Sequence, residues 1–138
     1  MVGILVVSHG RLAHALISSV QSIVGHLPRV CGVSIWPKDR DKEIRNKIQH
    51  KMAEVDDGDG VVILTDILGG TPTNASLSVS GNDNVQVVTG VNMPMLLTLS
   101  SYRQGTSLVE IAELVKKSGR RSITLAKKVI GSMALKRM

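Results

Sequence analysis

The chain has 138 residues, a length typical of a single domain built around one hydrophobic core. Hydrophobic residues make up 43% of it and charged residues 20%, which excludes a disordered or low-complexity chain and is typical of a soluble globular protein. With no Phe, one Trp and one Tyr, the core is expected to be aliphatic, and the side chains that stack on flavins or single-stranded bases are nearly absent. The single cysteine, Cys31, excludes an intrachain disulfide and a cysteine-rich zinc site.

The net charge of +6 is unevenly distributed along the chain. Residues 1–115 hold 9 Lys and Arg against 11 Asp and Glu, whereas residues 116–138 hold 8 basic residues and no acidic one. Because this basic end has no interleaved aromatic residues, we interpret it as a solvated segment and expect no nucleic-acid partner. The apolar run Val2–Val7 is too short to span a membrane and no basic stretch precedes it, so it predicts a strand and a cytoplasmic protein.

Apolar runs of strand length alternate with helical patterns along the chain. The predicted strands are Gly3–Val7, Val30–Ile35, Val61–Leu64 and Val85–Val88. The predicted helices are Leu12–Val24, a helix capped by Asp39 and reaching Val55, Pro94–Tyr102 and Ser107–Ser118. This alternation predicts an α/β fold, in which a mostly parallel sheet carries helices on both faces through right-handed crossovers.

The C-terminal segment follows a different pattern. Ser122–Leu125 alternates polar and apolar residues, which is typical of a half-exposed edge strand and favours pairing with a partner subunit. A helix over Ala126–Lys136 is the competing interpretation of this end of the chain.

Polar and glycine-rich residues follow three of the predicted strands. In open parallel sheets, ligands bind outside the carboxyl ends of the strands, where the strand order reverses. With a strand order of 2-1-3-4, the first and third strands are neighbours about 4.8 Å apart, so His9 and Asp66 are expected to face each other. A carboxylate that accepts one ring N–H fixes the tautomer and leaves the other ring nitrogen as a nucleophile.

The segment after Asp66 favours an anion as the target of that nucleophile. Gly69, Gly70 and Thr71 precede Pro72, a residue favoured in the first turn of a helix. Glycines permit a close approach of the backbone, and a helix N-terminus offers unpaired N–H groups and a favourable dipole for phosphate. Phosphoryl transfer to a histidine follows as a hypothesis.

Each of these residues is also compatible with a purely structural role. His9 is also compatible with a structural role, Asp66 with a helix cap, and the two glycines with an ordinary turn. His14 and His50 lie within predicted helices and His26 in a loop, and none of them follows a strand.

Several other chemistries on this architecture are excluded by the residues present. A receiver domain needs acidic residues after its first strand to hold Mg²⁺, where this chain has Ser8 and His9. No G-x-G-x-x-G follows the first strand, and neither a G-x-x-x-x-G-K-[ST] loop nor a G-x-S-x-G elbow occurs. No H-x-x-x-H or H-E-x-x-H pair is present either, so we expect no metal and no cofactor.

Three blocks in the same order resemble the enzyme IIA domain of the mannose-type bacterial phosphoenolpyruvate-dependent sugar phosphotransferase system (PTS). They are GILVVSHG (3–10), LTDILGGTPTNAS (64–76) and VVTGVNMPMLL (87–97), within a similarity that spans residues 2–118. The resemblance implies a flavodoxin-like domain over residues 1–120, followed by a basic segment over 121–138. It also implies that His9 is phosphorylated, that Asp66 orients the ring, and that Gly69, Gly70 and Thr71 hold the phosphoryl oxygens.

The resemblance also implies partners. The phosphoryl donor is expected to be the histidine-containing phosphocarrier protein HPr and the acceptor a separate IIB component, since no IIB sequence follows; contact with a membrane is expected only through a transporter complex. Family members are typically homodimers that exchange a C-terminal antiparallel strand, for which Ser122–Leu125 is the candidate. Leu68 and Thr73 stand where some relatives carry aromatics. The alternative function is a regulatory module whose phosphohistidine controls a partner without sugar transport; the sugar and the IIB partner are not specified by the sequence.

Overall fold

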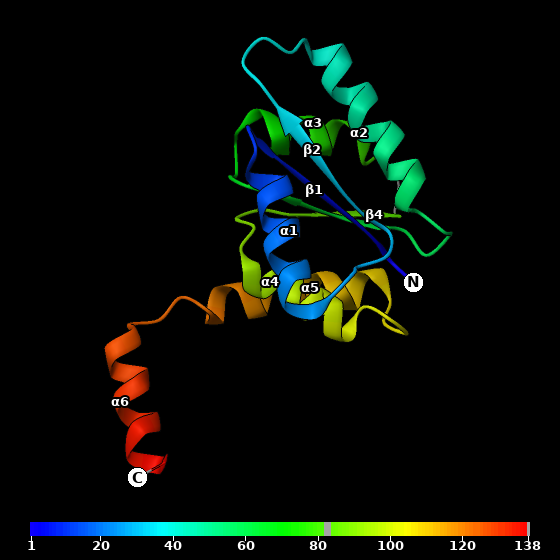
Figure 1. Ribbon diagram of the computed structural model, residues 1–138. Coiled ribbons are helices and arrows are strands. Elements are labelled where there is room, and N and C mark those ends of the chain that lie inside the picture. The colour runs from blue at the N-terminus through cyan, green and yellow to red at the C-terminus, as the bar shows by residue number, and fades with distance from the viewer. Residues whose placement is uncertain (82–83, 138) are drawn as a thin grey trace.

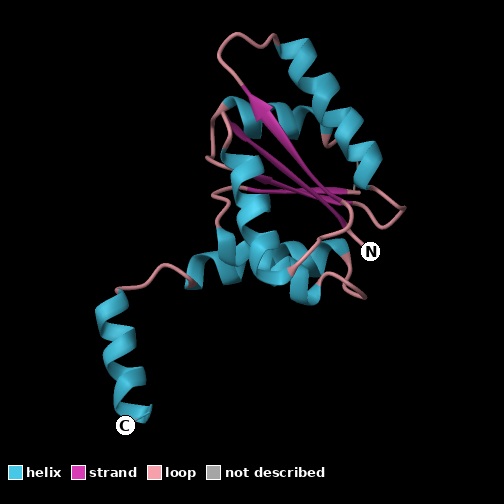
Figure 2. Cartoon of the chain, viewed as in Figure 1, coloured by secondary structure: helices cyan, strands magenta, loops and turns pink. Residues whose placement is uncertain are grey.

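The four apolar runs form one parallel sheet in a computed structural model, which describes residues 1–81 and 84–137 (Figures 1 and 2). The strands are β1 (Gly3–His9), β2 (Val30–Ile35), β3 (Val61–Thr65) and β4 (Val85–Val88). Their order is β2-β1-β3-β4, and each neighbouring pair is parallel. The predicted fold class and strand order are therefore confirmed.

The helices are α1 (Leu12–Val24), α2 (Asp41–Val55), α3 (Thr71–Val79), α4 (Met93–Tyr102), α5 (Leu108–Arg121) and α6 (Ala126–Arg137). Helices α1 to α5 cover both faces of this sheet, and α6 follows them in the chain. Helices α1, α4 and α5 pack on one face, whereas α2 and α3 pack on the other (Figure 1).

The central strand β1 divides the core into two clusters, because successive side chains of a strand point to opposite faces. Ile4 and Val6 contribute to the cluster under α1, α4 and α5, whereas Leu5 and Val7 contribute to the cluster under α2 and α3. The buried apolar side chains of the described residues are aliphatic or methionine, as the composition predicted.

Helix α2 begins later than the sequence pattern predicted. It starts at Asp41, and Asp39 is not its cap. The Asp39 carboxylate instead accepts a hydrogen bond of 2.8 Å from the backbone N–H of Trp36 and lies 3.5 Å from the Lys47 Nζ. Asp39 therefore closes the turn after β2, a role for which short acidic side chains are as well suited as for helix caps.

The C-terminal segment differs from the strand interpretation. Residues 122–125 form no strand in this single chain, and the competing helix is present as α6, which extends away from the rest of the chain (Figure 1). A strand needs a hydrogen-bonded neighbour, so exchange of this segment between two chains stays a prediction. Among the described residues, no helix has the length and apolar character needed to cross a membrane.

Candidate functional site

His9 and Asp66 meet at the carboxyl edge of the sheet. His9 is the last residue of β1, and Asp66 follows the last residue of the neighbouring strand β3. One carboxylate oxygen, Asp66 Oδ2, accepts a hydrogen bond of 2.8 Å from the His9 backbone N–H and also lies 2.8 Å from the ring Nδ1. The Asp66 side chain is 11% exposed and the His9 side chain 55%. The carboxylate is thus enclosed while the ring reaches solvent.

This contact assigns different roles to the two ring nitrogens. Because an ionised carboxylate only accepts hydrogen bonds, Nδ1 carries the proton and Nε2 keeps its lone pair. Partial burial raises the pKa of Asp66, but the hydrogen bonds from the backbone and ring of His9 outweigh burial and hold that pKa below its ordinary value. Asp66 is therefore ionised at neutral pH, and Nε2 is available as a nucleophile.

The loop after Asp66 packs against the His9 ring. A Cβ built on Gly70 would lie 3.0 Å from His9 Cε1 and 3.7 Å from Nε2, so glycine leaves the space that the ring occupies. Gly69 has a φ of +86°, a left-handed conformation that glycine adopts without strain. Helix α3 begins directly after Gly70, with Pro72 in its first turn and no side-chain cap at Gly70. The ring therefore packs against the residue at which α3 begins, and a helix N-terminus with unpaired N–H groups favours an anion.

Thr71 is placed differently from the other predicted site residues. Its side chain is exposed and lines a cavity of about 260 Å³ between α2 and α3, together with Asp41 and Arg45. In the described part of the chain, no hydrogen bond joins Thr71 to His9. The structure therefore brings His9, Asp66 and Gly70 together, whereas Thr71 lies in the same turn and faces the neighbouring helix.

Three buried hydroxyl groups at this edge were missed by the sequence analysis. Ser8 Oγ accepts a hydrogen bond of 2.7 Å from the Ala13 N–H, and Thr65 and Thr73 bond to each other. Ser8 and Thr65 are polar residues at the ends of apolar strands, and that break in the apolar pattern was the available signal.

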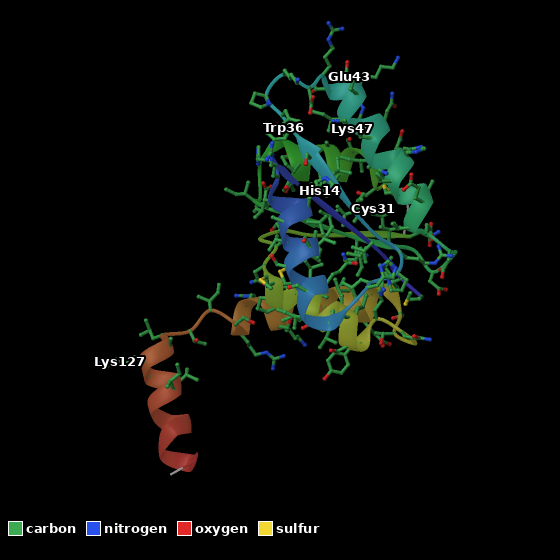
Figure 3. All side chains as sticks on the ribbon, in the orientation of Figure 1. His14, Cys31, Trp36, Glu43, Lys47 and Lys127 are labelled. Carbon is green, nitrogen blue, oxygen red and sulfur yellow. The ribbon has the colours of Figure 1, made fainter. Side chains whose placement is uncertain are left out.

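Exposed apolar side chains flank the histidine. We call this set the apolar rim: it consists of Leu12, Trp36, Ile67 and Leu68, which follow β1, β2 and β3 at the same edge of the sheet. Leu68 is 75% exposed and Trp36, which Figure 3 labels at the end of β2, is 39% exposed. Exposed apolar side chains that gather at one edge of a domain are typical of a protein-docking surface.

The remaining histidines have no comparable surroundings. The His14 ring packs against the backbone of Gly32, and His50 pairs with the exposed Glu54 on the surface of α2 at 3.2 Å. His26 lies in the loop between α1 and β2. Among the described residues, only His9 has a partly buried carboxylate on one ring nitrogen.

Fold and site together define a class of protein. It is a parallel α/β domain in which a carboxylate holds one nitrogen of a histidine ring. The other ring nitrogen lies near the start of a helix, and the apolar rim surrounds it. The family model EIIA-man, described as PTS system fructose IIA component, matches residues 3–116. The chain belongs to this family, the IIA components of the sugar phosphotransferase system. The resemblance found in the sequence is thereby confirmed.

Individual relatives agree with this assignment. The chain is 29% identical over 128 residues to the PTS system mannose-specific EIIAB component of Escherichia coli, covering 91% of the chain but only 40% of that relative's length. It is 27% identical to the PTS system fructose-specific EIIA component of Bacillus subtilis, covering 88% of the chain and 84% of that relative.

Solved structures show the same fold. A PTS IIA protein associated with the fucose utilization operon of Streptococcus pneumoniae is 30% identical, with a TM-score of 0.82 over 93% of this chain and 95% of that one. The phosphotransferase system component EIIA of Streptococcus agalactiae is 26% identical, with a TM-score of 0.84 over 93% of this chain and 99% of that one.

Proposed function

We propose that this chain is a cytoplasmic phosphocarrier of the sugar phosphotransferase system, which accepts a phosphoryl group on His9 Nε2 from phospho-HPr and passes it to a separate IIB component. The observation that carries this proposal is the contact between Asp66 and His9 Nδ1, which leaves Nε2 with its lone pair on a half-exposed ring next to Gly70, where α3 begins.

The transfer follows from ordinary bond changes. The Nε2 lone pair forms a bond to phosphorus while the phosphorus–nitrogen bond of the donor phosphohistidine breaks, and its electron pair stays on the donor ring. The donor ring, protonated on its other nitrogen, leaves as neutral imidazole, and His9 gains the positive charge that the donor loses. The Asp66 carboxylate stabilises this charge through Nδ1, and the N–H groups of α3 stabilise the phosphoryl oxygens. Positioning supplies most of the rate enhancement.

The apolar rim supports a protein as the phosphoryl donor. A donor histidine reaches Nε2 only if its carrier docks over the carboxyl edge, where Trp36 and Leu68 offer exposed apolar area. Apolar and aromatic groups at the centre of a contact contribute most of the binding free energy. On this proposal the basic segment 121–138 serves a homodimer and has no part in nucleic-acid binding.

Labelling with the phosphotransferase chain tests the proposal. The protein is incubated with radiolabelled phosphoenolpyruvate, enzyme I and HPr, and the expected result is one acid-labile phosphate per chain. We expect His9→Ala to abolish the label and His14→Ala, a matched change on the adjacent helix, to retain it. Addition of a purified IIB component should then remove the label from the wild-type protein by phosphoryl transfer to IIB. An unlabelled wild type, or a labelled His9→Ala protein, would show that the proposal is wrong.

A further inference from the structure

A pair of buried threonines lies directly behind the candidate site. Thr65 ends β3 and Thr73 lies in the first turn of α3; they are 0% and 1% exposed. Their Oγ1 atoms are 2.6 Å apart, and Thr73 Oγ1 donates a second hydrogen bond of 2.6 Å to the Ile67 carbonyl. A hydroxyl carries a single proton. Because Thr73 donates its proton to the Ile67 carbonyl, Thr65 must be the donor in the hydrogen bond between the two threonines.

These hydrogen bonds continue to the carboxylate. Thr73 holds the carbonyl of Ile67, and the N–H of the same residue donates a hydrogen bond of 3.0 Å to Asp66 Oδ1. The second oxygen, Asp66 Oδ2, serves His9. Both oxygens of Asp66 are therefore oriented, one by the residue that Thr73 fixes and the other by the reactive histidine.

We propose that Thr73 is a positioning residue for phosphoryl transfer, and that it acts through Ile67 on the orientation of Asp66 and hence on the His9 ring. This inference rests on the proposed function and names a residue that never contacts the phosphoryl group. Its hydroxyl links the end of β3, the loop after Asp66 and the start of α3, which are the three segments that surround the His9 ring.

Loss of this hydroxyl is expected to reach the ring. Replacement of Thr73 by the nearly isosteric Val leaves the Ile67 carbonyl and the Thr65 hydroxyl without their buried partner, a state that costs free energy until the loop moves to satisfy them. The backbone of this loop packs closely on His9, because a Cβ added to Gly70 would lie only 3.0 Å from the ring carbon Cε1 and 3.1 Å from Ile67 Cγ2. A small displacement of the loop therefore alters the position of Nε2.

The test compares Thr73→Val with Thr73→Ser, which keeps the hydroxyl. We expect Thr73→Val to lower the rate constant of transfer at saturating phospho-HPr about 10- to 100-fold. Its KM for phospho-HPr should change less than the rate constant, by under about 5-fold, since Leu12 and Trp36 of the apolar rim lie outside the displaced loop. Thr73→Ser should recover most of the rate. Ser76→Ala is the matched control. Ser76 is also buried on α3, but among the described residues its hydroxyl donates a hydrogen bond only to the Pro72 carbonyl within that helix, at 2.6 Å.

A second measurement does not depend on phosphoryl transfer. In nitrogen NMR spectra of the unphosphorylated protein, the Nδ1–H signal of His9 should shift or broaden in Thr73→Val and stay at its wild-type position in Ser76→Ala. If Thr73→Val fails to fold, Thr65→Val removes only the donor to Thr73, and a smaller loss of rate with the same direction of NMR change is expected.

The two proposals fail separately. An unlabelled wild type whose His9 signal still responds to Thr73→Val would overturn the proposed function and leave only the effect of Thr73 on the position of the His9 ring. A wild-type rate in Thr73→Val, an equal loss in Thr73→Ser, or an unchanged His9 signal would overturn the role of Thr73.

Discussion

At the scale of single residues, the proposed chemistry depends on how the Asp66 carboxylate divides its hydrogen bonds. Oδ2 receives both the backbone N–H and the ring of His9, and Oδ1 receives the N–H of Ile67. A group that only accepts hydrogen bonds is required at Oδ2, because a donor there would reverse the tautomer of the ring.

Asp66→Asn is therefore expected to slow phosphorylation while the fold persists. Its amide can turn an NH₂ group toward Nδ1, which would move the ring proton to Nε2 and remove the nucleophilic lone pair. We expect the rate to fall about 100-fold or more, in line with other carboxylate–histidine pairs. Single-turnover transfer from phospho-HPr measures the effect. The control is Asp59→Asn, an acidic residue in the loop before β3 at the opposite edge of the sheet; equal rates for wild type and Asp66→Asn would contradict the role of Asp66.

The residues of the site were predictable to different degrees. His9 and Asp66 could be paired from sequence, because parallel neighbouring strands bring their carboxyl ends to one edge and both residues stand there. The sequence could not predict which of Thr71 and Thr73 points toward the core behind the site. Residues two apart on a helix point about 200° apart, so one threonine faces the core and the other does not, and only the seating of α3 on the sheet decides which. The structure turns Thr73 inward.

At the scale of elements, the sequence pattern predicts the strands and helices of the core better than it predicts the contacts at their ends. Asp39 is a good helix cap by residue type, yet its carboxylate closes the turn at Trp36. Ser122–Leu125 alternates like a strand, but a strand forms only where another strand pairs with it. The periodicity of apolar residues predicts the strands and helices of the core because burial of one face imposes that periodicity. It does not predict which of several possible hydrogen-bond partners a polar side chain contacts.

Arg103 is a junction of this kind that no periodic pattern marks. It follows α4, is 3% exposed, and its guanidinium donates hydrogen bonds to the carbonyls of Pro28, Arg29 and Val2 at 2.8–3.4 Å. It thereby joins α4 to the segments that lead into β1 and β2, at the edge of the sheet opposite His9.

Arg103→Met should destabilise the protein by about 2–4 kcal/mol, because three buried or partly buried carbonyls lose a charged donor. Urea unfolding followed by circular dichroism measures the free energy of unfolding. Arg121→Met, on the exposed end of α5, is the control and should change it by less than about 0.5 kcal/mol. Phosphorylation of folded Arg103→Met should proceed at the wild-type rate; an unchanged unfolding free energy would show that this junction is not a stabilising one.

At the scale of the whole molecule, the body and the C-terminal segment differ in charge and in packing. Residues 116–138 hold 8 basic residues and no acidic one, and α6 extends away from the sheet and its helices (Figure 2). Apolar side chains on this segment are exposed, with Ile123 at 81% and Leu125 at 79%. Beside it, a groove of about 600 Å³ runs along the edge strand β4 and is lined in part by Val87 and Ile123.

Exposed apolar side chains of the basic segment, next to an open sheet edge, predict association through residues 122–138. We expect the full chain to be a dimer by light scattering at micromolar concentration and a chain that ends at Arg121 to be a monomer. The full-length double variant Ile123→Glu and Leu125→Glu should also dissociate, since it places charge where apolar area would be buried. A monomeric wild type, or a truncated chain that remains dimeric, would contradict this role of the segment.

Trp36 gives the molecule an intrinsic optical probe. It is the only tryptophan in the chain, it is partly exposed, and its six-membered ring lies 3.7 Å from the Cβ position of Gly10, the residue that follows His9. Its emission therefore originates next to the residue that follows His9, the proposed phosphoryl acceptor. The only tyrosine, Tyr102, precedes Arg103 at the far edge of the sheet. Phosphorylation and arrival of a tryptophan-free carrier should both change indole fluorescence, so that stopped-flow mixing can time each event on the unlabelled protein.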